Sequence, residues 1–306
     1  MTQNPPSALT AIPVFYSPAM VADAGSFSPS AGKPGAAVAS WQSLGLPFVI
    51  HAPTPVAAEQ FGVAHNPDFV ADVLAGRRDN GFGNKSPGVA AALPWTSGAM
   101  LSAAREAICN GQGAVAPCSG FHHAGYNFAG GFCTFNGLMV TANALLAEGT
   151  ARRVGILDCD EHWGNGTQDI IDRLKLTKFV EHYSPCHEFG RTARAEAFLA
   201  ALPKLLKRFA DCDVVLYQAG ADPHIDDPLG GWLTTAQLRR RDEIVFAELK
   251  QLGVPVAWNL AGGYQRDADG GIRPVLDIHD HTMLAFATVH GIGTGDQDVL
   301  YCRDAA

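Results

Sequence analysis

Basic residues are few in this chain and are not gathered into blocks. The 306 residues include 22 Lys and Arg against 30 Asp and Glu, which gives a formal net charge of −8. No stripe of alternating aromatic and basic residues occurs either. Because nucleic-acid binding relies on Lys and Arg to neutralise phosphates, we expect no nucleic-acid partner.

Closely spaced cysteines and a long apolar segment near the start are also missing. The seven cysteines are scattered and form no CxxC pair, which argues against a disulfide framework and against a thiolate zinc site. The opening residues MTQNPPSALTAIPVF have no basic start and no long apolar run. They resemble neither a signal peptide nor a membrane anchor, so we expect a cytoplasmic protein with reduced thiols and no membrane partner.

Internal repeats and low-complexity linkers are absent as well. Hydrophobic residues make up 47% of the chain and charged residues 17%, which is enough to bury a large core. We therefore expect residues 1–306 to form a single domain. The segments 20–40 and 79–97 are rich in Gly, Ser and Pro and are interpreted as loops.

Short apolar runs alternate with helical patterns in the rest of the chain. The runs RRVGILDCD, DVVLYQAG and VPVAWNLAGG predict buried strands, and a helix is expected to begin at a Ser97 cap and end near Gly111. Continuous apolar strands separated by helices predict an α/β fold, an open parallel sheet with helices on both faces. Such sheets bind ligands beyond the carboxyl ends of their strands.

Polar or flexible groups follow three of the predicted strands. They are Asp158, Asp160 and His162; Asp222 and His224; and Gly262, Gly263 and Tyr264. Side chains two positions apart in extended chain point the same way, so Asp160 and His162 can face one cation. Asp222 would complete a set of two carboxylates and one imidazole, which suits a divalent transition metal and leaves one position open for water.

Three further residues belong to the same prediction. Asp158 is interpreted as a hydrogen-bond acceptor that orients a histidine or helps to hold a monovalent ion, rather than as a metal ligand. The stretch CSGFHHAGYNFAGGFCTFNG supplies the adjacent pair His122 and His123, and a neutral imidazole is well matched to proton transfer near pH 7.

Four sequence blocks together resemble the signature of the zinc-dependent histone deacetylase superfamily, which includes bacterial histone-deacetylase-like and acetylpolyamine amidohydrolases. The blocks are CSGFHHAGYNFAGGFCTFNG, ILDCDEHWGNGTQ, AGADPHIDDPLGG and LAGGY. The resemblance covers residues from about 118 to 264 and implies the arginase/deacetylase fold. It also implies hydrolysis of an acyl amide by a metal-activated water.

Carried over position by position, the resemblance implies a role for each of ten residues. Asp160, His162 and Asp222 would bind one Zn²⁺. His123 would be the general base, with His122 as its electrostatic partner, and Tyr264 would donate to the amide oxygen. Asp158 and Asn165 would orient the two histidines, and Gly131 and Phe132 would line the substrate channel. A K⁺ ion near Asp158 is a further expectation, although FVEHYSPCHEFG matches the family's pattern poorly.

Three positions depart from the family's pattern. Trp163 stands where many relatives have a second histidine, and Ala261 stands where a glycine is often found. Asn165 replaces an aspartate that some relatives use, which should leave His123 less basic.

Several functions remain open at this point. The first is removal of acetyl or related acyl groups from a lysine-like amine in a peptide or small molecule. The second is acetylpolyamine deacetylation, although the 79–97 segment is short for the insertion that polyamine-specific members carry. A catalytically silent binding relative and a two-manganese ureohydrolase are less favoured, because the catalytic positions are filled and the second metal would need acids in place of His122 and His123. A homo-oligomer is left open.

Overall fold

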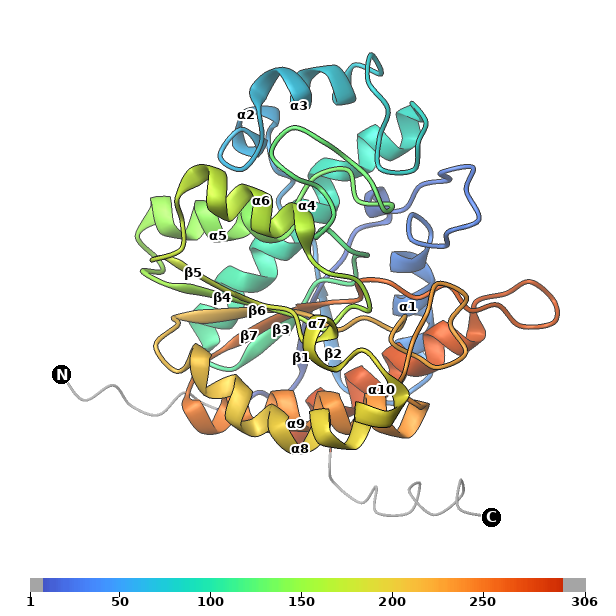
Figure 1. The fold of residues 1–306 in the computed structure, drawn as a ribbon, viewed down its shortest axis with the longest axis vertical. Coiled ribbons are helices and arrows are strands. Elements are labelled where there is room, and N and C mark those ends of the chain that lie inside the picture. Colours follow the sequence, from blue (N-terminus) through green and yellow to red (C-terminus); the bar gives the residue numbers. More distant parts are fainter. Residues whose placement is uncertain (1–7, 294–306) are drawn as a thin grey trace.

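One parallel sheet forms the centre of the molecule (Figure 1). The computed structural model describes residues 8–293, and seven strands lie in the order β2-β1-β3-β7-β6-β4-β5. Their bounds are β1 Ile12–Phe15, β2 Phe48–His51, β3 Gly113–Val115, β4 Val154–Asp158, β5 Val180–Tyr183, β6 Val214–Gln218 and β7 Val256–Asn259. All neighbouring strands pair in parallel, which confirms the predicted fold class.

Helices cover both faces of this sheet. One face carries α2 Ala58–Phe61, α3 Pro67–Leu74, α4 Pro87–Asn110, α5 Gly137–Glu148 and α6 Asn165–Leu174. The other carries α1 Lys33–Gln42, α8 Ala195–Leu206, α9 Thr235–Leu252 and α10 Arg273–His290. The short α7 Cys186–Phe189 and three 3₁₀ turns, Pro18–Met20, Thr192–Arg194 and Lys207–Phe209, complete the elements of the described part.

The central strands are apolar on both sides because each side packs on a helical layer. In β6, Val215 and Tyr217 belong to the core under α8–α10, whereas Val214 and Leu216 belong to the core under α4–α6. This alternation explains why β4, β6 and β7 are continuous hydrophobic runs up to their last residue, which is polar.

The predicted start of α4 is wrong. Ser97 is buried inside the helix, which begins ten residues earlier at Pro87. Ser86 caps it by accepting a hydrogen bond from the amide of Val89 at 3.4 Å, and proline is favoured at the first helical position. The second half of the predicted 79–97 loop is therefore helix, and it continues through Pro94.

One other local prediction needs correction. The predicted loop 20–40 ends at residue 32, because α1 begins at Lys33 and buries that side chain completely. Helix α8 contains Pro203 in its interior and runs to Leu206. None of the helices within residues 8–293 is long and apolar enough to cross a membrane.

Four adjacent strands of the sheet, β3, β7, β6 and β4, bring the predicted site together. His122 and His123 follow β3, Tyr264 follows β7, Asp222 follows β6, and Asp160 follows β4. Because the strands are parallel, these segments all emerge at the same edge of the sheet.

Candidate metal and catalytic site

Asp160, His162 and Asp222 lie close enough to share a metal ion. Each can contribute one ligand atom such that all three atoms are within 4.8 Å of one another. The Nδ1 atom of His162 lies 3.3 Å from Oδ1 of Asp160 and 3.3 Å from Oδ2 of Asp222. Two carboxylates and one imidazole are therefore aimed at the same small volume, with both aspartates buried.

The electrostatics of Asp160, His162 and Asp222 favour a bound cation. Burial and the neighbouring Asp160 raise the pKa of Asp222, and the adjacent carboxylates of Asp160 and Asp222 raise the pKa of His162 to about 11. Oδ2 of Asp222 is buried and has no hydrogen-bond donor among the described residues. An unsatisfied buried carboxylate oxygen is costly, so the donor set fits a divalent cation, which the three side chains would hold with an open position for water.

The backbone around these ligands leaves room for the carboxylates. The amide of Gly262 donates to Oδ2 of Asp160 at 2.8 Å. A Cβ atom at Gly262 would lie 2.2 Å from Oδ2 of Asp222. Only glycine therefore allows the segment after β7 to approach both aspartates.

The two adjacent histidines differ in proton affinity. Burial alone would lower the pKa of His122, but Asp158 and Asp160 raise it to about 9, and its Nδ1 lies 2.7 Å from Oδ2 of Asp158. The pKa of His123 is lowered by burial and by the positive charge of His122. Nδ1 of His123 donates to Oδ1 of Asn165 at 2.6 Å, which leaves its Nε2 as a free base.

Asp158 is fully engaged by protein donors. Its Oδ1 accepts from Nε2 of Gln218 at 2.9 Å and from the amide of Asp160 at 3.4 Å, and its Oδ2 faces His122. It does not belong to the cluster of candidate metal ligands, and its role as an orienting residue stays a prediction. The predicted K⁺ ion near Asp158 stays a prediction.

Gly131 and Phe132 form the tip of a tight turn beside His123. The turn is closed by hydrogen bonds between Gly130 and Cys133, and both central residues have positive φ, 53° and 62°. A Cβ atom at Gly131 would lie 2.3 Å from Cδ2 of His123. For Phe132 the left-handed backbone costs about 1 kcal/mol or more. Such strain is typical of functional positions and here sets the ring beside Tyr264, with ring centroids 5.4 Å apart.

Tyr264 is nearly buried, with 8% of its surface exposed. Burial, followed by the charges of Asp222 and Asp160, raises the pKa of its phenol. The hydroxyl therefore keeps its proton and can act as a hydrogen-bond donor. The amide of Tyr264 donates to Oδ2 of Asp227 at 2.8 Å, which fixes the start of the segment after β7.

Two buried cationic side chains, Lys33 and Arg241, donate hydrogen bonds to backbone carbonyls beside the site, and the sequence did not reveal either of them. Nζ of Lys33 donates to the carbonyl oxygens of Ala261 and Gly262 at 2.6 and 3.1 Å. Arg241 donates from Nη1 to the carbonyl oxygens of Cys159 and Gly220 at 3.1 and 2.8 Å. Both contacts join segments far apart in the sequence, and no local pattern marks either residue.

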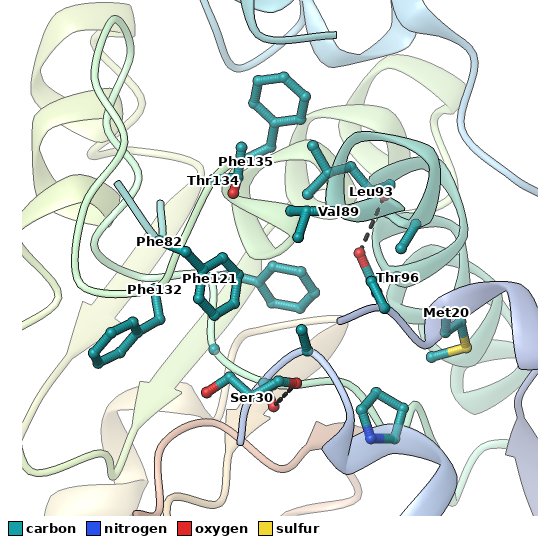
Figure 2. Close-up of a pocket in the computed structure, with 16 residues that line it drawn as sticks. Met20, Ser30, Phe82, Val89, Leu93, Thr96, Phe121, Phe132, Thr134 and Phe135 are labelled. Carbon is teal, nitrogen blue, oxygen red and sulfur yellow. Dashed lines mark hydrogen bonds between the residues drawn. The ribbon is translucent and has the colours of Figure 1, made fainter. Parts of the chain in front are cut away.

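A groove and a cavity lie next to the candidate site. An open groove of about 550 Å³ borders it on one side and includes His123, His162, Trp163 and His187. On the other side of Phe132, a smaller cavity of about 60 Å³ lies against α4 (Figure 2). Its lining contains no titratable residue, whereas the groove includes His123 and His162, so the proton chemistry belongs to the groove.

Comparisons with known proteins agree with this geometry. A family model described as Histone deacetylase domain matches residues 35–187 and 183–272. Acetylpolyamine amidohydrolase 1 of Pseudomonas aeruginosa is 32% identical over 177 residues, covering 49% of this chain and 50% of that protein. Acetylpolyamine amidohydrolase of Mycoplana ramosa is 30% identical over 171 residues, covering 47% and 49%. The matched segments thus span about half the length of these two relatives.

Solved structures share the fold across nearly the whole chain. The HDA15 HD domain matches with a TM-score of 0.71 at 21% identity, covering 94% of this chain and 90% of that one. An acetylpolyamine aminohydrolase from Burkholderia pseudomallei matches with a TM-score of 0.69 at 20% identity, covering 91% and 99%. Because the family model also covers most of the sequence, this chain belongs to the histone deacetylase domain family, whose members include deacetylases and amidohydrolases.

Proposed function

We propose that residues 1–306 form one catalytic domain, a zinc-dependent amidohydrolase that removes acetyl or related acyl groups from lysine-like amines. The observation that carries the proposal is the convergence of Asp160, His162 and Asp222 on one small volume beside His123. A divalent ion bound there would polarise the acyl carbonyl and lower the pKa of a bound water toward about 7.

The side chains around that volume can move the protons that the reaction needs. Nε2 of His123 takes a proton from the attacking water and later returns it to the leaving amine. The positive charge on His122, held by Asp158, stabilises negative charge as it develops on the reacting group. The hydroxyl of Tyr264 donates to the carbonyl oxygen as that oxygen becomes negative, which is the role of an oxyanion-hole donor.

The residues at the channel set what can reach the reacting atoms. Phe132 and Gly131 would enclose the alkyl stem of the substrate, and their tight turn leaves space for His123. This supports a substrate whose amide lies at the end of an extended aliphatic chain, as in acetyl-lysine.

Acetylpolyamine deacetylation is the second candidate. Relatives named acetylpolyamine amidohydrolase support it, at 32% and 30% identity over about half their length. An acylated diamine presents the same aliphatic stem as acetyl-lysine. The two candidates therefore differ only in what lies beyond that stem.

A substrate panel tests the proposal. We expect the purified protein to release acetate from an acetyl-lysine peptide or from N-acetylputrescine, and to stop when a chelator is added. Release resumes when Zn²⁺ is restored. Absence of turnover on acetyl-lysine, trifluoroacetyl-lysine, longer acyl-lysines and acetylputrescine alike, with Zn²⁺ present, would refute it.

A further inference from the structure

Phe27 is a large apolar side chain that the fold leaves in solvent. It is 60% exposed, more than any other large hydrophobic residue in the described part of the chain. An exposed ring that extends an apolar patch can mark a contact surface, whereas a singly exposed apolar residue is ordinary. Phe27 lies in the segment 20–40, which was predicted to be a loop.

This loop is fastened on both sides of Phe27. The carbonyl oxygen of Phe27 accepts from Nη2 of Arg266 at 2.8 Å, and the carbonyl oxygen of Ala24 accepts from Nδ2 of Asn84 at 2.7 Å. The hydroxyl of Ser119 also donates to the carbonyl oxygen of Ser30 at 2.9 Å. Phe27 is therefore presented from an anchored backbone rather than from a loose one.

The ring of Phe27 continues the aromatic wall of the substrate channel outward. It meets Phe132 edge-on with centroids 5.3 Å apart, and it lies 6.5 Å from the ring of Tyr264. Phe82 contacts the same Phe132 ring at 5.8 Å. Phe27 stays 60% exposed beside these rings, so most of its side chain is accessible to a ligand.

A second exposed apolar residue approaches Tyr264 from a different loop. Leu229 is 38% exposed, and its amide donates to Oδ1 of Asp227 at 3.0 Å. The other oxygen of Asp227 accepts the amide of Tyr264. One carboxylate thus ties the backbone of Leu229 and that of Tyr264.

We propose that Phe27 is a specificity-determining residue that packs against an apolar side chain next to the acylated lysine of a peptide substrate. The inference rests on the proposed function. Phe27 offers apolar surface that matches an apolar side chain flanking the acylated lysine of a peptide, and a polyamine carries no such side chain. Covering about 60 Å² of apolar surface corresponds to about a tenfold gain in binding.

Two acetyl-lysine peptides that differ only in the flanking residues, leucine or alanine, test the proposal. We expect wild-type kcat/KM to be about tenfold higher for the leucine peptide, chiefly through KM. In Phe27→Ala the preference should fall to near one, and Phe27→Leu should retain part of it. If the role of Phe27 were purely structural, Phe27→Ala would lower kcat/KM for both peptides equally and leave the ratio of the two values unchanged.

Phe179→Ala is the matched control. Phe179 is 48% exposed and precedes β5, at the opposite end of the strands from the site, so the ratio should stay at its wild-type value. The inference would be overturned if the ratio of kcat/KM for the two peptides were equal in wild type and Phe27→Ala. It would also be overturned if Phe27→Ala lost as much kcat/KM on N-acetylputrescine as on the leucine peptide. Absence of turnover on every substrate would instead count against the proposed function.

Discussion

His65 should make the fold sensitive to mild acid. Its buried ring donates from Nδ1 to the carbonyl oxygen of Gly125 at 2.9 Å, and its Nε2 accepts the amide of Asn136 at 2.8 Å. Protonation of Nε2 would remove that acceptor. Burial accordingly lowers the pKa of His65 from 6.5 to about 4.

The direction and size of the effect follow from proton linkage. Between pH 6.5 and about 4 the unfolded chain binds a proton at His65 and the folded chain does not, so the free energy of unfolding falls as pH falls through that window. Lowering the pKa of His65 from 6.5 to about 4 corresponds to about 3 kcal/mol of unfolding free energy over the whole pH window. About 2 kcal/mol of this should be lost between pH 7 and pH 5.

Urea unfolding followed by tryptophan fluorescence measures the effect. We expect wild type to lose about 2 kcal/mol more than His65→Gln between pH 7 and pH 5, because other titrating groups cancel in the difference. His51→Gln removes an exposed histidine on β2 and should leave the wild-type loss unchanged. An identical loss in wild type and His65→Gln would refute the role assigned to His65.

Two further predictions concern the catalytic residues. Tyr264→Phe should bind metal normally but lose about a hundredfold or more in kcat on an acetyl-lysine peptide, because it removes an oxyanion donor; unchanged turnover would exclude Tyr264 from the reaction. Gly131→Ala should cost about 1 kcal/mol of stability at a positive φ and at least about a hundredfold in activity, since its Cβ would displace His123; an active variant with a wild-type unfolding midpoint would contradict the crowded turn.

The sequence predicted those parts of the molecule that local patterns encode. Continuous apolar runs identified β4, β6 and β7, and the residues directly after them are the ones that converge in the structure. The start of α4 was missed because Gly88 and Pro94 lower the apparent helix propensity of its first half. The Ser86–Pro87 pair is the start signal that could have identified it.

Long-range contacts account for the site residues that were missed. Lys33 reaches carbonyl oxygens 228 and 229 residues away, and nothing in its neighbourhood of Gly, Ser and Pro indicates burial. Both ring nitrogens of His65 bond to the segment that follows β3, which lies far from His65 in the sequence. Such partners depend on the packing of distant elements and are not readable from spacing.

Metal content measured by mass spectrometry tests the central claim most directly. After equilibration with Zn²⁺ and removal of free metal, wild type should hold one zinc ion per chain. Asp222→Asn should retain far less, because it removes a carboxylate from the set of three. Two manganese ions per chain, or zinc bound equally well by wild type and Asp222→Asn, would contradict a single metal held by Asp160, His162 and Asp222.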